Sequence, residues 1–172
     1  MISSKTILSI CGVLAVVAAC RPADQAAAPD VVAPGSADQI MTNVVTNLAV
    51  DGRRKDYVRA DTAYTYQEAQ RIEFVRLKVT FFDLDGQPTA ELTAKRAVYT
   101  IGDRRLDARG DVVVVTPRGD SLRGARVTYD NTLRQFRSDS AFVFKSKAGL
   151  TKGKGFTADP DLRNVVPGRT RP

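Results

Sequence analysis

Few residues in this sequence could carry out acid–base or nucleophilic chemistry. Histidine is absent from all 172 residues, which removes the commonest general base and the usual zinc ligand. Two aspartate pairs, Asp83 with Asp85 and Asp159 with Asp161, have a spacing on which carboxylate catalysis could rest. Each pair lies beside glycine or proline in a predicted turn, where aspartate is favoured because it hydrogen-bonds the local backbone. Since a glycine-rich phosphate loop is also missing, we predict a protein that is not an enzyme and uses no cofactor or metal ion.

One cysteine is placed for a different reaction, covalent acylation. An apolar run at residues 7–19 follows Lys5 and ends in small residues directly before Cys20. The run is shorter than the roughly 20 residues that a membrane-spanning helix needs, but its length suits the apolar part of a secretory signal. The segment resembles a bacterial lipoprotein signal, which implies cleavage before Cys20 and lipid attachment to its sulfur. Cys11 would leave with the signal, so no disulfide is expected; the alternative is a short anchor helix with two incidental cysteines.

The expected lipid anchor sets the domain boundaries. We predict a signal peptide at 1–19, the lipidated cysteine and a flexible linker at 20–39, a single folded domain at 40–166 and a disordered tail at 167–172. A lipid-anchored domain implies a periplasmic location with the membrane as one partner. The net charge is +7, but in that compartment nucleic acid is not an expected partner. The basic residues alternate with apolar ones, which indicates a solvated strand face or, alternatively, attraction to anionic lipid or an acidic partner.

A repeated strand unit organises the expected domain. Each unit opens on an aliphatic residue, continues with a small residue two positions later and closes on an aromatic residue. The openers lie about 30 residues apart, a step typical of stacked supersecondary units. The units are Val58, Ala60 and Tyr64; Leu92, Ala94 and Tyr99; Leu122, Gly124 and Tyr129; and a weaker fourth from Leu150 to Phe156.

Turn signals divide the domain into strands. Asp51-Gly52 and Asp85-Gly86 are hairpin signals, and further reversals are expected at 102–104, 117–120 and 130–131. The segments between them, including 75–84, 111–115 and 140–146, are rich in β-branched and aromatic residues. Residues 40–48 fit either a helix or an opening strand. The pattern predicts an all-β, antiparallel fold, either two sheets or one folded sheet with an apolar interior, whose strands are added in sequence order.

Alternation predicts which side chains face that interior. Val75, Leu77, Val79 and Phe81 share one face, because charged residues and threonine occupy the positions between them. In the second and third units the alternation slips before the tyrosine, which predicts a β-bulge. The first unit is one residue shorter and is expected to need no bulge.

Several of these segments carry a resemblance to a known family. "LTAKRAVY", "RRLDARGDVVV", "LRGARVTYD", "RQFRSDSAFVF" and "LTKGKGFTADPDLRNV", behind a membrane-anchoring N-terminus, resemble the LptC family of lipopolysaccharide-export proteins, related to OstA-type β-jelly rolls. The resemblance covers residues 45–166. It implies a V-shaped β-jelly roll that receives lipopolysaccharide or a related glycolipid from the membrane subunits of an ABC transporter and passes it to an LptA-like jelly-roll protein. Typical members have a transmembrane helix, whereas a lipid anchor is predicted here, in the inner membrane or alternatively the outer one.

The apolar strand faces are the candidate lipid site, because acyl chains bind where apolar surface is removed from water. Tyr99 and Tyr129 are expected at the margin of the site with hydroxyls exposed to water. The same pattern fits a closed core, since alternation reports which way a side chain faces and not what fills the space. A closed core would favour a structural envelope lipoprotein or an interaction module. The predicted lining residues are Leu77, Val79, Phe81, Leu92, Val112, Val114, Phe142 and Phe144.

The two ends of the sheet are candidate partner sites. A sheet built in sequence order leaves one edge near residues 42–50 and another near 150–166, and each could accept a strand from another protein. The predicted partner-binding edge consists of Lys152, Gly153, Lys154, Gly155 and Phe156.

Overall fold

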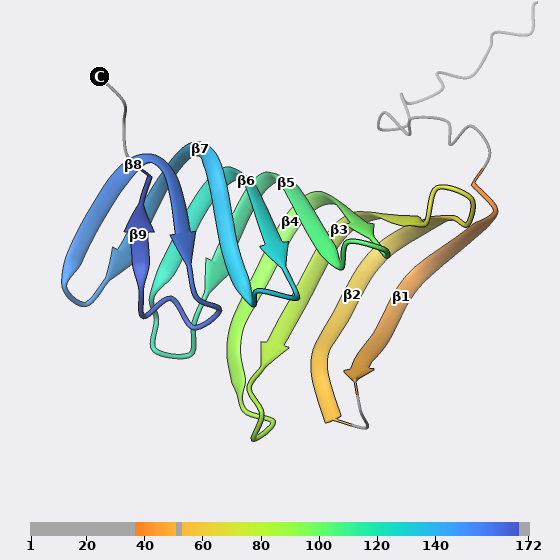
Figure 1. Ribbon diagram of the computed structural model, residues 1–172, viewed down its shortest axis with the longest axis horizontal. Helices are drawn as coiled ribbons and strands as arrows, with labels where there is room; N and C mark the ends of the chain where they lie inside the picture. Colours follow the sequence, from red (N-terminus) through yellow and green to blue (C-terminus); the bar gives the residue numbers. More distant parts are fainter. Residues whose placement is uncertain (1–36, 51–52, 169–172) are drawn as a thin grey trace, which may run out of the picture. The chain divides into compact units, whose positions relative to one another are not determined.

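One antiparallel sheet of nine strands forms the fold of the described residues (Figure 1). The computed structural model describes residues 37–50 and 53–168. The strands are hydrogen-bonded in sequence order, so the predicted all-β, antiparallel fold with consecutive strands is confirmed. The segment 40–48 is part of the first strand and not a helix. The strands are β1 (Gln39–Val50), β2 (Arg53–Tyr66), β3 (Arg71–Phe82), β4 (Pro88–Thr100), β5 (Arg105–Val115), β6 (Ser121–Asp130), β7 (Gln135–Ser146), β8 (Gly149–Ala158) and β9 (Val165–Pro167).

Some predictions concern residues outside the described ranges. The signal peptide, Cys20, most of the linker, the Asp51-Gly52 turn and the last four residues of the tail all fall there. Among the residues that the structure describes, no helix is long and apolar enough to cross a membrane.

Local side-chain chemistry closes the hairpins. One Asp83 carboxylate oxygen accepts hydrogen bonds from the backbone N–H groups of Asp85 and Gln87, at 2.9 and 2.8 Å. Gly86 completes this turn with a φ of 78°, a left-handed conformation that glycine adopts without a steric penalty. Asp130 likewise accepts hydrogen bonds from the backbone of the turn that follows β6. The carboxylates next to the predicted reversals therefore stabilise turns.

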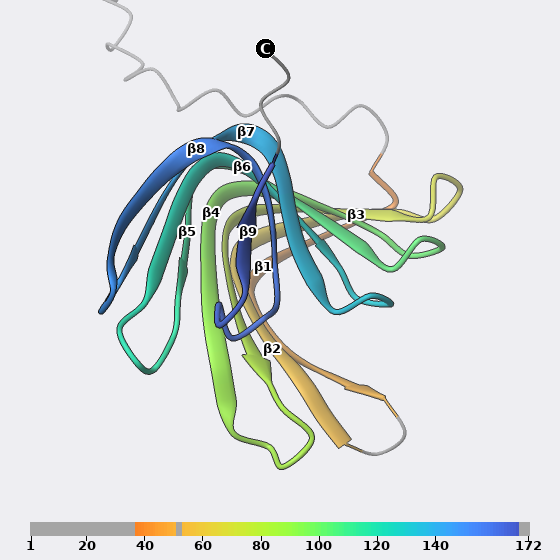
Figure 2. The same cartoon turned by 60° about the vertical axis from the view of Figure 1, so that its left-hand side comes forward.

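A line of irregular backbone crosses the sheet, and the sheet folds over along it (Figure 2). On β3 and β5 the line includes Arg76 and Asp111, which both have a φ of 50°. Between the pairs Thr93–Val113 and Arg96–Arg109, β5 has one more residue than β4. The second repeat unit therefore slips at a bulge, as predicted, although the extra residue lies in the neighbouring strand.

One prediction about alternation is wrong near this line, whereas the expectation that the first unit needs no bulge is confirmed. Val75 was expected to face the interior, but Phe74 packs against the core in its place, because the left-handed backbone at Arg76 reverses the alternation. The first unit has no extra residue relative to its neighbours. Its alternation nevertheless slips, since Ala60 and Ala63 are both buried.

The predicted opener of the fourth unit is also misplaced. Leu150 is 58% exposed, whereas Phe156 is buried. Gly153, between them, pairs with Phe142, and a Cβ atom at Gly153 would lie 2.9 Å from the Phe142 ring. Leu150 therefore does not point into the interior, and Phe156 is the large apolar residue of β8 that does.

The core is most tightly filled by aromatic side chains of β3, β6, β7 and β8. The rings of Phe81, Tyr129 and Phe136 are in mutual contact, with centroids 4.6–5.3 Å apart. Phe142 and Phe156 form a second pair at 5.1 Å. Such dense packing leaves little room for a ligand in this half of the sheet.

Candidate functional site

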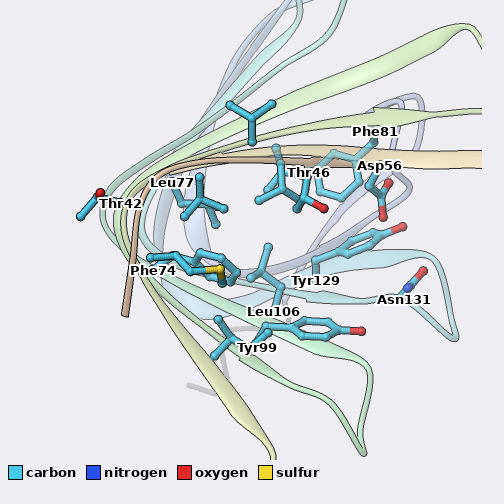
Figure 3. A pocket seen from close by; sticks show the side chains of 16 residues that line it. Thr42, Thr46, Asp56, Phe74, Leu77, Phe81, Tyr99, Leu106, Tyr129 and Asn131 are labelled. Atoms are coloured by element: carbon cyan, nitrogen blue, oxygen red, sulfur yellow. The ribbon is translucent and has the colours of Figure 1, made fainter. Parts of the chain in front are cut away.

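The interior is not filled at the β1 end, where the fold encloses an open cavity of about 660 Å³ (Figure 3). That volume is in the range of small-molecule sites. The first three strands supply most of the lining, and β4 to β6 supply the opposite wall. The lining residues are Met41, Thr42, Val44, Val45 and Thr46 of β1; Asp56 and Val58 of β2; Ile72, Phe74, Leu77, Val79 and Phe81 of β3; and Tyr99, Leu106, Tyr129 and Asn131.

The cavity stays open because β1 contributes little to the core. Val44 packs against the core from this strand, whereas Met41 and Val45 line the cavity and remain 37% and 60% exposed. β1 is also the outermost strand of the described sheet, so it has no neighbour that would bring further side chains to this wall. An apolar face therefore remains accessible at this end.

Polar groups gather on one side of the cavity. Figure 3 shows the Asp56 carboxylate, the Asn131 amide and the hydroxyls of Tyr99 and Tyr129 on that side, opposite apolar side chains such as Phe74. Asp56 is buried although it is acidic. The arrangement is that of an amphipathic site, which binds an apolar chain in one region and polar atoms in another.

Tyr129 lies deeper than predicted. Its side chain is 5% exposed, so the expectation of a margin position in contact with water is wrong for this residue. Burial and, to a smaller extent, the negative charge of Asp56 raise the pKa of the Tyr129 phenol to about 12, while Arg134 opposes the shift. Tyr99, by contrast, is only partly buried.

The raised pKa predicts a loss of stability in alkali. The pKa of Tyr129 is higher in the folded state than the unfolded value of about 10. The contribution of the protonated Tyr129 phenol to the free energy of unfolding is therefore complete below pH 10 and is lost as the pH rises towards 12. Each pKa unit corresponds to about 1.4 kcal/mol. We expect the free energy of unfolding, measured with urea at pH 9 and 11, to fall further in the wild type than in Tyr129→Phe. Equal falls would contradict the assignment.

The structure separates the predicted lining residues into two groups. Leu77, Val79, Phe81, Tyr99 and Tyr129 border the cavity. The others lie in the filled part of the interior, where Leu92, Val112, Val114 and Phe142 are buried and Phe144 packs partly buried against the core.

Sequence reasoning missed much of the cavity wall. Ile72 and Phe74 were not among the predicted lining residues, because the alternation was followed only from Val75 and the slip at Arg76 was not recognised. Val44 and Val45 belong to the apolar stretch that was left open between helix and strand. The sequence signal that could have identified them is the cluster of aliphatic residues Ile40, Met41, Val44 and Val45 in the first segment of the domain.

The predicted partner-binding edge is partly covered. β9 pairs with Phe156–Ala158, and the Gly168 N–H donates a hydrogen bond to the Gly155 carbonyl at 2.7 Å. Phe156 is buried, so Gly155 and Phe156 do not form the free edge that was expected. Lys152, Gly153 and Lys154 lie on the part of β8 that β9 does not pair with.

The second aspartate pair has a local structural role. One Asp159 oxygen accepts a hydrogen bond from the backbone N–H of Arg163 at 2.8 Å, and the Asp161 carboxylate lies 2.6 Å from the Arg163 side chain. Within the described ranges, no group of three or more histidine, cysteine or acidic residues could hold a metal ion.

Comparison with known proteins identifies one family. The family model described as "Lipopolysaccharide-assembly, LptC-related" matches residues 6–166. No curated protein matches the chain. The matched region begins within the predicted signal and extends into β9.

Proposed function

The chain belongs to the LptC-related family of lipopolysaccharide-assembly proteins, and we propose that it is a non-catalytic lipopolysaccharide-binding component of the export bridge. Membership of the family indicates a role in lipopolysaccharide transport on the periplasmic side of the Gram-negative envelope. In the proposed step the protein accepts lipid extracted by an inner-membrane ABC transporter. It then passes the lipid to the next jelly-roll protein by strand addition at a sheet edge.

The open cavity is the observation that carries the proposal. Its lining is largely aliphatic and aromatic, and it lies where β1 leaves the interior accessible. Each methylene group transferred from water into such a site contributes about 0.8 kcal/mol. A transient acyl-chain site therefore needs no reaction and no cofactor.

The location of the cavity supports acceptance of lipid at the β1 end. The cavity lies beside the outermost strand of the described sheet, so a jelly roll docked on β1 would extend the apolar surface. The interior at the β8 end is filled by Phe142 and Phe156. We therefore place the upstream partner at β1 and the downstream partner at β8.

We also propose that a lipid on Cys20 anchors the protein, in the inner membrane or alternatively in the outer membrane. The proposal rests on the small residues before Cys20 and on the length of the apolar run at 7–19. Mass spectrometry of the mature protein should find an acylated Cys20 at its N-terminus; a mature chain that retains residues 1–19 would contradict it.

The filled half of the interior favours a second candidate function. Leu92, Val114 and Phe142 form a closed core of the kind expected for a structural envelope protein or interaction module. In that case the cavity would hold no lipid in cells, which separates the two candidates.

Photo-crosslinking at two phenylalanines tests the proposal. Phe74 lines the cavity, whereas Phe142 is part of the filled core. A photoreactive phenylalanine analogue at position 74 is expected to capture lipopolysaccharide in cells, and the same analogue at 142 is expected to capture none. Both proteins must retain the β-sheet circular dichroism of the wild type. Failure at position 74 in a folded protein would favour the structural alternative.

A further inference from the structure

The segment 159–168, here called the strap, is attached to the sheet at two places. Leu162 inserts into the apolar core, where it is 2% exposed and belongs to the same cluster as Phe156 and Ala158. The backbone at Leu162 is left-handed, with a φ of 54°. A few residues later the strap forms β9 and pairs with β8. The same short segment therefore closes the interior and covers an edge.

An arginine from the turn between β5 and β6 holds the first attachment. The Arg118 side chain donates a hydrogen bond to the backbone carbonyl of Asp161 at 2.8 Å. It also lies 2.9 Å from the carboxylate of Asp120, which is itself buried. The Asp120 carboxylate orients the Arg118 side chain, and the solvent-exposed hydrogen bond from Arg118 to Asp161 links the Leu162 turn to the body of the sheet.

The second attachment occupies the position of an added strand. Phe156, Thr157 and Ala158 pair with Pro167, Val166 and Val165. The Gly168 N–H extends this pairing to the Gly155 carbonyl. β9 has only three residues, so the preceding part of β8 has no strand neighbour on this side within the described ranges. Such a short strand protects an edge from aggregation but pairs weakly compared with a longer one.

We propose that β9 occupies the position on β8 at which a partner strand binds, and that an incoming strand displaces β9 and thereby withdraws Leu162 from the core. This inference rests on the proposed function, because it assigns the downstream partner to β8. Displacement of β9 would then free the β8 edge and withdraw Leu162 from the core at the same time, because β9 and Leu162 belong to one continuous segment. Lipid would then leave at the β8 end only when a partner is present to receive it.

The geometry also specifies the kind of strand that fits. A Cβ atom at Gly168 would lie 3.1 Å from the Lys154 carbonyl oxygen and 3.2 Å from the Gly155 Cα. Both contacts are with backbone, which moves less readily than a flexible side chain. The partner strand therefore needs glycine at the position facing Gly155, preceded by an apolar residue in the place of Val165, which packs partly buried against the core.

A reversible disulfide provides the test. Thr157 and Val166 are directly paired, at a spacing that permits a disulfide in an antiparallel pair. In the full chain, oxidised Thr157→Cys/Val166→Cys is expected to bind the downstream jelly-roll protein of the same cell about tenfold more weakly than after reduction. The two single-cysteine variants control for pairing with Cys11 or Cys20. Equal affinity in the oxidised and reduced states would overturn the inference.

Gly168→Val tests the same idea in the opposite direction and needs no disulfide. The added side chain is expected to weaken β9 pairing, speed hydrogen exchange at Phe156–Ala158 and tighten partner binding several-fold, because the competing strand is then less often in place. Faster exchange without tighter binding would overturn the inference.

Lipid capture by the analogue at Phe74 is measured in each variant and should be unchanged by oxidation. Loss of capture in every variant, with redox-dependent partner binding retained, would reject the proposed function and leave the displacement of β9 supported.

Discussion

Replacing Phe136 with alanine is expected to lower the free energy of unfolding by about 3–5 kcal/mol. Phe136 has no exposed surface, and its ring contacts those of Phe81 and Tyr129 at centroid distances of 5.3 and 5.0 Å. Truncation would remove both contacts and leave a cavity in the part of the interior that is already filled. Since domains are typically stable by about 5–15 kcal/mol, the variant is expected to be marginally folded. Urea unfolding followed by circular dichroism measures the change.

Phe144→Ala is the matched control. It lies in the same strand, β7, but it packs only partly buried at the side of the core. Its truncation removes less buried surface and leaves a space that water can enter, so the cost should be clearly smaller than at Phe136. Similar costs at the two positions would mean that β7 does not form one side of a filled core in this half of the sheet.

The order of the strands could be predicted from the sequence because each reversal has its own local chemistry. Asp83 and Gly86 form a tight turn through contacts within five residues, and Asp130 does the same after β6. Local turns between consecutive strands favour pairing of sequence neighbours. The order β1 to β9 follows without knowledge of any distant contact.

The bends could not be predicted in the same way. Arg76 has a left-handed backbone that residues other than glycine seldom adopt, so its side chain gives no sign of the change. The bend at Arg76 reverses the alternation, which is why Val75 was assigned to the interior and Phe74 was not. The backbone there is determined by the folding of the whole sheet.

Which part of the interior stays open could not be predicted, for a different reason. Leu77 and Leu92 both point inward and are both buried, yet Leu77 borders the cavity and Leu92 does not. Alternation specifies the face, whereas filling depends on side chains that arrive from distant strands. Leu92 lies in the half that Phe136 and Phe142 fill, while the wall beside Leu77 comes from β1, whose Val45 remains exposed.

The two ends of the sheet therefore differ in a way that suits directional transfer. The β1 end has an open apolar wall and an outermost strand with no covering segment among the described residues. The β8 end has a filled interior and an edge partly covered by β9. A lipid would enter where the surface is already exposed, and it would leave where a partner must first displace β9.

Phe74→Glu is expected to reduce lipopolysaccharide capture about tenfold or more while the sheet remains folded. Phe74 lines the cavity and is only partly buried, so a carboxylate at this position remains hydrated in the empty protein. An acyl chain that fills the cavity would remove that water, and an unpaired charge without water costs several kcal/mol. Capture is measured with a photoreactive residue at Val44, another lining position.

Val75→Glu is the matched control because it introduces the same charge one residue away. Val75 does not line the cavity, and successive side chains of a strand point to opposite faces. Capture should therefore remain at the wild-type level in Val75→Glu, and both variants should keep the β-sheet circular dichroism of the wild type. If both variants lost capture equally, the effect would be one of general charge, and the cavity would not be the lipid site. If neither lost it, the acyl chains would bind elsewhere on the protein.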